Sequence, residues 1–201
     1  MNTVAVAAER AAQRSALKAR RRAIAPAARR AAARQVAMNA SRTLHLFPGL
    51  RVAVYAPMRH ELSTAPLIGL LRRHGCRLYL PRITDPRRCR MQFIEAAGPM
   101  RRNRLGIEEP VHARPIPTRN LDLVFVPLVG FDSTGMRLGM GAGYYDRAFA
   151  FRRLRTSWRR PRLVGIGYAV QQLPAIRGGA HDVRLDAIIT EQEVFQCSTG
   201  C

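Results

Sequence analysis

Hydrophobic residues gather in short runs along the chain, and polar or alanine-rich stretches separate these runs. The clearest run is residues 121–127, Leu-Asp-Leu-Val-Phe-Val-Pro, which predicts a buried β-strand. Other runs, rich in β-branched or apolar residues and set off by proline, glycine or polar residues, predict further strands. These strands are expected at residues 51–56, 77–80, 91–95, 163–168 and 187–190.

Helices are predicted where the stretches around and between these runs are rich in helix-forming residues. Pro26 ends the first such stretch, and Pro48-Gly49 lies beyond the second. The helices are expected at residues 4–24, 27–46, 65–73 and 144–154. Residues 98–120 contain four prolines and are expected to form a loop.

This order of strands and helices predicts an α/β protein, a three-layer α/β/α sandwich with a largely parallel central sheet. A length of 201 residues suits one domain, which is expected to span residues 1–201. Within that domain, residues 1–25 are expected to form a basic N-terminal helix and residues 196–201 a short tail. Residues 1–34 also have the arginine-rich composition of a mitochondrial transit peptide.

Arginine dominates the charge of the chain. Of the 34 basic residues, 33 are arginine and one is Lys18, and the formal net charge is +21. An anionic partner is one explanation, and a compositional habit of the source genome is another. The arginines are scattered instead of forming a stripe with interleaved aromatic residues. A nucleic-acid partner therefore stays open but is not predicted.

Two other classes of protein are disfavoured by the composition. No run of about 18 apolar residues is present, so no membrane-spanning helix is expected. The four cysteines show neither a C-x-x-C pair nor a neighbouring histidine at zinc-site spacing. Because no secretory signal is visible, we expect a cytoplasmic protein with reduced thiols. We also expect a monomer.

A glycine-rich segment follows the clearest strand. Gly139, Gly141 and Gly143 stand at every second position, between Arg137 and Arg147. Exposed backbone N–H groups beside guanidinium groups suit phosphate oxygens, and the acidic residue at position 146 could hold a bridging magnesium ion. The segment matches neither a P-loop nor a dinucleotide fingerprint. On spacing alone, a purely structural turn is an equally good interpretation.

Three further groups of polar residues allow both a chemical and a structural interpretation. Glu61 follows a predicted strand and could accept hydrogen bonds from an amine or amide of a ligand, or carry charge at a helix N-terminus. Arg10 and Arg14 lie four residues apart on one helix face, where they could clamp phosphate or face solvent. Asp182 and Asp186 could be metal ligands or loop acids with local partners.

Taken together and in this order, these segments resemble the 5-formyltetrahydrofolate cyclo-ligases, also called methenyltetrahydrofolate synthetases. The most specific part is residues 122–132 running into Arg-Leu-Gly-Met-Gly-Ala-Gly-Tyr-Tyr-Asp-Arg at 137–147. Supporting matches lie at residues 10–14, 55–64, 104–110, 165–168 and 181–191, so the resemblance covers nearly the whole chain. The N-terminal match favours a helix of the domain over a cleaved presequence.

The departures from the family pattern are mild. Arg10 and Gln13 stand where the family usually has lysine and leucine, and Ala142 stands where glycine or lysine is common. Arginine offers a planar fork of donors in place of a point charge, so phosphate binding should survive the first change. The alanine puts any side-chain contact from its own position in doubt.

The resemblance implies ATP- and Mg²⁺-dependent conversion of 5-formyltetrahydrofolate to 5,10-methenyltetrahydrofolate, with release of ADP and phosphate. It also implies phosphorylation of the formyl oxygen and ring closure by the N10 amine. The implied ATP-binding residues are Arg10, Arg14, Arg137, Leu138, Gly139, Met140, Gly141, Ala142, Gly143, Tyr144 and Tyr145. The implied folate-binding residues are Ala56, Glu61, Met140, Gly141, Ala142, Gly143 and Tyr144. Asp146 and Asp182 are the implied Mg²⁺ ligands, and Arg137, Tyr144 and Asp146 the implied catalytic residues.

Two other functions remain as alternatives. One is a related ATP- or folate-binding homologue without cyclo-ligase activity, acting on another formylated or thiamine-pathway compound. Intact Glu61 and the complete glycine-rich segment argue against it. The other is a basic RNA-associated protein in which the glycine-rich segment is only structural.

Overall fold

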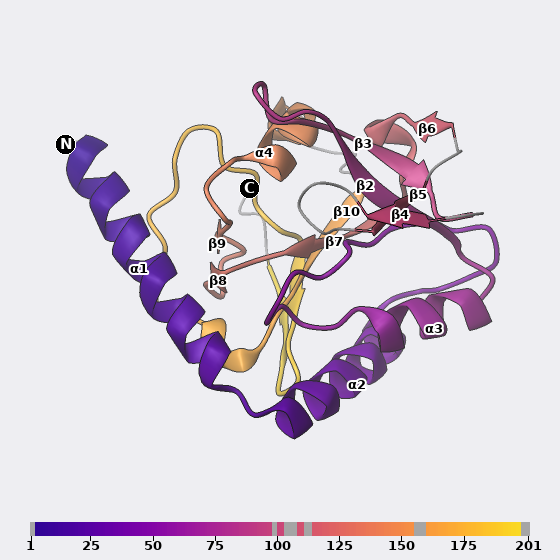
Figure 1. Ribbon diagram of the computed structural model, residues 1–201, viewed down its shortest axis with the longest axis horizontal. Coiled ribbons are helices and arrows are strands. Elements are labelled where there is room, and N and C mark those ends of the chain that lie inside the picture. The colour runs from indigo at the N-terminus through magenta and orange to yellow at the C-terminus, as the bar shows by residue number, and fades with distance from the viewer. Residues whose placement is uncertain (1–2, 98–99, 103–107, 111–113, 155–159, 198–201) are drawn as a thin grey trace.

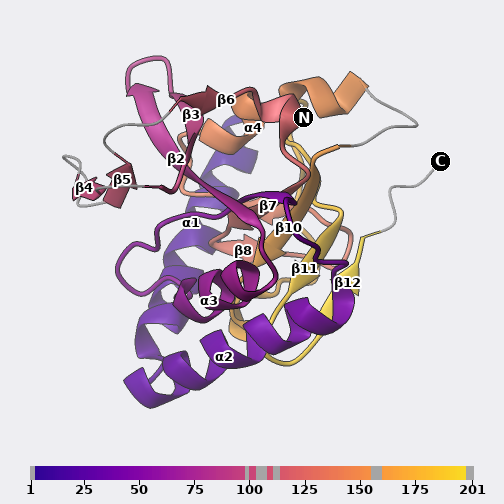
Figure 2. The same cartoon turned by 90° about the vertical axis from the view of Figure 1, so that its right-hand side faces the viewer.

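The computed structural model describes residues 3–97, 100–102, 108–110, 114–154 and 160–197 (Figures 1 and 2). The α-helices among these residues are α1 (Thr3–Ala23), α2 (Pro26–Thr43), α3 (Ala65–Arg73) and α4 (Tyr144–Ala148). Short 3-10 helices follow at η1 (Thr118–Asn120), η2 (Ala150–Leu154) and η3 (Ala169–Gln171). Within the described part of the chain, no helix is long and apolar enough to span a bilayer.

The strands are β1 (Arg51–Ala53), β2 (Arg77–Asp85), β3 (Arg90–Glu95), β4 (Met100–Arg102), β5 (Glu108–Pro110), β6 (Pro115–Ile116), β7 (Leu123–Pro127), β8 (Gly130–Phe131), β9 (Arg137–Leu138), β10 (Arg162–Ile166), β11 (Ala187–Ile189) and β12 (Val194–Gln196). The main sheet has the order β12-β11-β10-β7-β1-β2-β3-β6. Its five inner strands from β11 to β2 are parallel, and β12 and β3 pair with them antiparallel. The expected largely parallel sheet is confirmed.

Helices cover both faces of this sheet and so complete the predicted three-layer sandwich. Successive residues of a strand face opposite sides. Phe125 and Val164 accordingly pack in the core beneath α2 and α3. Val124 and Leu163 lie in the second core, with Phe149 at the end of α4. Figures 1 and 2 show α2 and α3 on one side of the sheet and α4 on the other.

Helix α1 lies at the edge of the sandwich, where it packs on β8 and η3 (Figure 1). Its Leu17 side chain is almost fully buried, in a small cluster with Val129, Met136 and Leu138. This cluster brings the basic N-terminal helix against the segment that contains the glycines.

Several element boundaries differ from the sequence predictions. Helix α3 has the predicted bounds, but α2 ends at Thr43 and β1 already ends at Ala53. Strand β2 continues through Pro81 to Asp85, because Pro81 pairs with Phe93 of the antiparallel strand β3. The helix predicted at 144–154 is divided into α4 and η2.

The segment 98–120, predicted as a loop, contains β4, β5, β6 and η1, so this prediction was wrong for the residues that the structure describes. Pro110 and Pro115 lie at strand ends and Pro117 lies directly before η1, positions that need no backbone donor, and Pro99 lies outside the described residues. The sequence reading also missed β8, β9 and β12. Because β12 ends at Gln196, the sheet includes the first residue of the expected tail, and residues 198–201 lie outside the described part.

Asp122 joins the starts of two central strands. Its carboxylate accepts hydrogen bonds from the Arg51 backbone N–H at 3.0 Å and from the Arg51 guanidinium Nε and Nη2, both at 2.9 Å. Arg160 lies 3.4 Å away on the same carboxylate. The hydrogen bond from Arg51 is the main reason why the pKa of Asp122 lies below its ordinary value.

We predict that Asp122→Asn lowers the free energy of unfolding at pH 7 by about 1 to 2 kcal/mol, a modest value because Arg51 is partly exposed. A carboxyl whose pKa is lowered on folding stabilises the fold above its unfolded-state pKa, and the effect is lost as the pH falls through the folded-state pKa. Urea unfolding should therefore show the gap between wild type and variant narrowing below the ordinary aspartate value of 3.8. A constant gap would contradict the assignment. Glu9→Gln, at an exposed ion pair, serves as the control and should change stability by less than about 0.5 kcal/mol.

Candidate functional site

The glycine-rich segment turns sharply between β9 and α4. Gly141 and Gly143 have φ angles of 108° and 72°, a left-handed region that other residues rarely adopt. Gly143 is the residue directly before α4, whose first turn contains Asp146. Gly139 needs no left-handed conformation, and open space surrounds the position of its missing Cβ. We call residues 139–143 the glycine loop.

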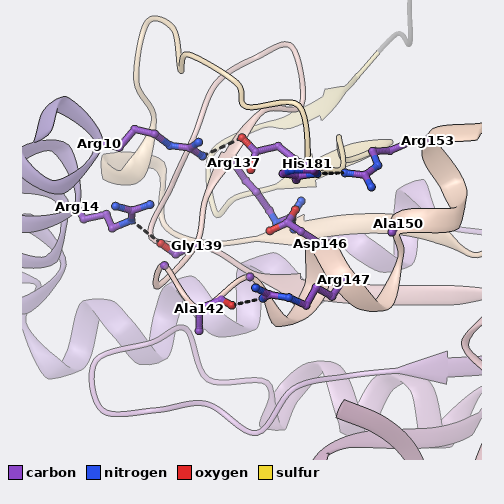
Figure 3. Close-up of a pocket in the computed structure, with 13 residues that line it drawn as sticks. Arg10, Arg14, Arg137, Gly139, Ala142, Asp146, Arg147, Ala150, Arg153 and His181 are labelled. Carbon is purple, nitrogen blue, oxygen red and sulfur yellow. Dashed lines mark hydrogen bonds and ion pairs between the residues drawn. The ribbon is translucent and has the colours of Figure 1, made fainter. Parts of the chain in front are cut away.

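A cationic cavity of about 430 Å³ lies on one side of the glycine loop (Figure 3). Its walls come from α1, the glycine loop, α4 with η2, and the segment before β11. The lining residues are Arg10, Arg14, Arg137, Gly139, Gly141, Ala142, Gly143, Asp146, Arg147, Ala150, Arg153, His181 and Asp182. Five guanidinium groups thus converge on one hollow that also contains two carboxylates.

The Arg137–Asp146 ion pair holds three segments of this cavity together. Arg137 Nη2 lies 2.6 Å from Asp146 Oδ1, and Arg137 Nη1 also donates to the Val183 carbonyl. The Val183 backbone N–H donates to the same Asp146 oxygen at 3.0 Å. The Arg137 side chain is 5% exposed, so it is essentially a buried charge whose counter-ion is this carboxylate.

Helix α1 contributes two arginines to the opposite wall. Arg10 Nη2 lies 3.0 Å from Asp182 Oδ2, which also accepts a hydrogen bond from the Gly179 backbone N–H at 2.8 Å. Arg14 Nε donates to the Gly139 carbonyl at 2.9 Å and so ties α1 to the glycine loop (Figure 3). Burial, and secondly the neighbouring Arg10, lowers the pKa of Arg14, as expected for a guanidinium group close to another cation.

Arg147 and Arg153 complete the cationic wall on the side of α4. Arg147 Nη1 donates to the Ala142 carbonyl at 2.5 Å, and Arg153 Nη1 to the Ala180 carbonyl at 3.2 Å. Both are exposed, so their side chains can turn toward a bound anion. From the sequence, Arg147 was placed beside the glycines, where a guanidinium group suits phosphate, but it was not among the residues assigned to ATP. Arg153 was not singled out, because nothing in the sequence separated it from the many other arginines.

A second cavity, of about 130 Å³, adjoins the cationic cavity at the glycine loop. Five residues line both cavities: Arg137, Gly139, Ala142, Gly143 and Asp146. The second cavity is otherwise lined by Glu61, Pro127, Leu128, Val129, Met140, Tyr144 and Tyr145. The Tyr145 side chain is partly buried, and desolvation of its phenol raises the pKa, so this side chain stays protonated.

Glu61 is fixed where it meets the second cavity. Its Oε2 accepts a hydrogen bond from the Met58 backbone N–H at 2.9 Å, and its Oε1 lies 3.9 Å from Arg21 Nη1. The Glu61 side chain is 8% exposed. Glu61 follows β1 and the glycine loop follows β7, two neighbouring parallel strands that end at the same edge of the sheet.

The structure places most of the residues singled out from the sequence around these two cavities. Arg10, Arg14 and Asp182 lie at the cationic cavity, and Glu61 at the second. Met140, Tyr144 and Tyr145 line the second cavity and are absent from the lining of the first. Two residues lie apart from both. The Leu138 side chain is fully buried, and Ala56 lines a separate cavity beside α3.

The two carboxylates of the cationic cavity suit a magnesium ion only as partial ligands. Among the described residues, no group of three or more His, Cys, Asp or Glu side chains could hold a metal by itself. The contacts within the described chain use Oδ1 of Asp146 and Oδ2 of Asp182, and the other oxygen of each has no such contact. Mg²⁺ typically takes one or two carboxylates and completes its shell with water and phosphate oxygens. The donor set therefore fits Mg²⁺ that arrives with phosphates.

The fold and this site define an α/β enzyme in which one glycine loop lines both a cationic cavity and a less polar cavity. The sequence profile of the 5-formyltetrahydrofolate cyclo-ligase family matches residues 6–191. The chain belongs to that family.

Individual relatives agree with this assignment. The 5-formyltetrahydrofolate cyclo-ligase of Escherichia coli (strain K12) is 32% identical over 189 residues, which cover 90% of this chain and 99% of the relative. The mouse enzyme of the same name is 27% identical over 149 residues, or 70% of this chain and 73% of its own.

A solved structure extends the agreement to three dimensions. The 5,10-methenyltetrahydrofolate synthetase of Aquifex aeolicus superposes with a TM-score of 0.78 at 26% identity, covering 96% of this chain and 94% of the other.

A side chain at a left-handed position of the glycine loop should destabilise the fold. Gly141→Ala should lower the free energy of unfolding by about 1 kcal/mol, because alanine is strained at this φ. Gly139→Ala is the matched control two residues away and should stay within about 0.5 kcal/mol of wild type. Denaturant unfolding of both variants checks the prediction. Equal effects at the two positions would contradict it.

Proposed function

We propose that the protein converts 5-formyltetrahydrofolate to 5,10-methenyltetrahydrofolate at the expense of ATP, with release of ADP and phosphate. Family membership supports the reaction class. One observation about this chain carries the rest: the glycine loop is the common wall of a cationic cavity and a less charged one. Phosphoryl transfer requires the two substrates to be in contact, and two cavities that share lining residues are adjacent.

The cationic cavity is the site we assign to the ATP triphosphate. Arg10, Arg14 and Arg147 surround it with donors that are matched to phosphate oxygens, and the glycine loop adds a main chain with little side-chain cover. Phosphoryl transfer asks little covalent chemistry of the protein, so positioning and charge neutralisation are its main contributions. Mg²⁺ bound at Asp146 and Asp182 would supply further neutralisation of the phosphate charge.

The second cavity is the site we assign to the formyl-bearing part of the folate. Glu61 presents a fixed carboxylate that can accept hydrogen bonds from pterin N–H groups. Tyr144 and Tyr145 line the same cavity and offer aromatic surface to a planar ring. We assign Tyr145 to the folate, although the resemblance implies an ATP contact, because Tyr145 lines the second cavity and not the first.

The chemistry explains why both substrates must share one wall. The formyl oxygen belongs to a resonance-stabilised amide and is a poor leaving group. It becomes a good one when it bonds to the γ-phosphorus of ATP while the bond from that phosphorus to ADP breaks. The N10 amine then attacks the formyl carbon and loses its proton, and the carbon–oxygen bond breaks to release phosphate.

In this mechanism the protein needs no covalent nucleophile. Arg137 lines both cavities and is the cation best placed to accompany the transferring phosphoryl group. Asp146 holds Arg137 in place through the 2.6 Å contact. Tyr144 lines the folate side close to the same point. We assign catalytic roles to these three residues.

The decisive experiment is incubation of the purified protein with 5-formyltetrahydrofolate, ATP and Mg²⁺, following the methenyl chromophore in the near ultraviolet. We expect product that requires all three components. Asp146→Asn keeps the shape of the side chain but removes its charge, and it should lower kcat roughly a hundredfold or more. Because the variant leaves the 5% exposed Arg137 side chain without its counter-ion, its unfolding temperature should fall, and the assay is run well below that temperature. Absence of product from well-folded wild-type protein would overturn the proposal, and near-normal turnover of the variant would remove Asp146 from the mechanism.

The division of the substrates between the cavities predicts a crossed kinetic pattern. Arg14→Ala should raise KM for ATP roughly tenfold, with KM for folate changed less than about twofold. Glu61→Gln should do the reverse. Arg14 suits this test better than Arg137, whose buried charge also holds the fold together. Steady-state kinetics with each substrate varied in turn measures both arms, and parallel changes in the two KM values would contradict the division.

A further inference from the structure

Two buried polar side chains contact the walls of the second cavity without lining it. We call the second cavity the folate cavity. Strand β10 ends at Ile166, and the chain continues through Tyr168 into η3, whose last residue is Gln171. Tyr168 and Gln171 are each 1% exposed, and neither lines the folate cavity. Polar groups buried this deeply are normally held by hydrogen bonds, so their partners indicate what they do.

Gln171 holds the wall of the folate cavity that follows β7. Its Nε2 donates to the carbonyl oxygens of Leu128 and Val129, each at 2.9 Å. Its Oε1 accepts a hydrogen bond from the Tyr168 backbone N–H at 2.8 Å. Leu128 and Val129 line the folate cavity and lie between β7 and β8, so neither belongs to a strand. The two N–H donors of one amide therefore fix two successive residues of the cavity wall.

Close packing fixes the side chain of Leu128 in the same wall. A Cβ atom at Gly165 would lie 2.8 Å from Leu128 Cδ2, and a Cβ atom at Gly167 would lie 2.7 Å from Leu128 Cδ1. Both distances are shorter than an ordinary carbon–carbon contact of about 3.5 to 4.0 Å. The two glycines therefore leave the space that the Leu128 side chain fills, while Gln171 holds the Leu128 carbonyl.

Tyr168 contacts another wall of the folate cavity. Its hydroxyl donates to the Glu61 carbonyl oxygen at 3.4 Å. Burial is the main reason why the pKa of Tyr168 is raised, so the hydroxyl keeps its proton and stays a donor. The Tyr55 hydroxyl donates to the following carbonyl, that of Leu62, at 3.2 Å. The main chain at Glu61 is thus held by two buried phenols, in addition to the contact of the Glu61 carboxylate with the Met58 backbone N–H.

We propose that Gln171 and Tyr168 are positioning residues that set the shape of the folate cavity. Gln171 acts through the carbonyls of Leu128 and Val129, and Tyr168 acts through the main chain of Glu61. The proposal rests on the proposed function, because that function assigns the folate to this cavity. Neither residue lines the cationic cavity, so loss of either contact weakens the binding of folate and leaves that of ATP unchanged.

The test measures KM for 5-formyltetrahydrofolate and for ATP in Gln171→Met, which keeps a long side chain but removes the amide. KM for the folate should rise roughly tenfold, because two carbonyls of the wall lose their donor. KM for ATP should change less than about twofold. Gln172→Met is the matched control, since the neighbouring Gln172 side chain is exposed, and it should change neither value. Asp122→Asn controls for lost stability at the starts of β1 and β7, away from the cavities, and should also change neither.

A second variant tests the contact of Tyr168 with Glu61. Tyr168→Phe keeps the aromatic ring and removes only the hydroxyl. In the wild-type background it should raise KM for the folate several-fold and leave KM for ATP within about twofold. In a Glu61→Gln background the same change should raise KM for the folate less than about twofold, because Tyr168 acts through Glu61. Full additivity of the two substitutions would overturn the role of Tyr168.

The outcomes separate this proposal from the proposed reaction. Helix α1, which carries Arg14, also packs on η3, so a general shift of η3 would raise both KM values together and overturn the positioning role. An unchanged KM for the folate in folded Gln171→Met would overturn it too, and Tyr168→Phe decides if Gln171→Met does not fold. Calorimetric titration with 5-formyltetrahydrofolate alone measures binding without turnover. Selective loss of folate affinity in the variants, with no turnover by wild type, would support positioning and overturn the reaction.

Discussion

The ion pair between the buried Arg137 and the partly exposed Asp146 is the interaction on which the whole site depends. Removing the Arg137 charge from water is expensive, and the expense is offset only when the charge has a close counter-ion and further hydrogen bonds. Here the 2.6 Å contact is supplemented by the backbone N–H and carbonyl of Val183. Strand β9, helix α4 and the segment before β11 are therefore held together by this one group of contacts. The glycine loop connects β9 to α4, so the same contacts fix both ends of the loop.

The positions of the few carboxylates show which of the many arginines are paired. The chain has 13 acidic residues against 34 basic ones, so acids are the scarce partner. Asp122 and Asp186 each lie directly before a strand, where they bind Arg51 and Arg152. Asp146 and Asp182 bind arginines at the cationic cavity. Most other arginines lie at the exposed surface, where charge costs little. High net charge alone thus says nothing about a partner, and the informative cations are the buried ones.

Local features of the fold could be predicted from the sequence, and contacts between segments far apart in the chain could not. Helix α3 was predicted with its bounds because Thr64 and Gly75 mark its two ends. The glycine loop was found because alternating glycines are conspicuous in the sequence itself. Strands β8 and β9 are too short for an alternating pattern and form through their pairing with each other. The contact of Arg10 with Asp182 depends on how α1 packs on β8 and η3, which no local pattern contains.

The two ion pairs in the cationic cavity bear on the order in which ligands would bind in the proposed reaction. Arg10 and Arg137 already hold the carboxylates of Asp182 and Asp146, so phosphates arriving alone would have to compete with these carboxylates. A nucleotide that brings Mg²⁺ would offer a cation to the carboxylates and anions to the arginines at once. Each buried charge would then change partner without being left uncompensated, which is the costly state. On the proposed function, the site would therefore suit the magnesium–nucleotide complex better than either ion alone.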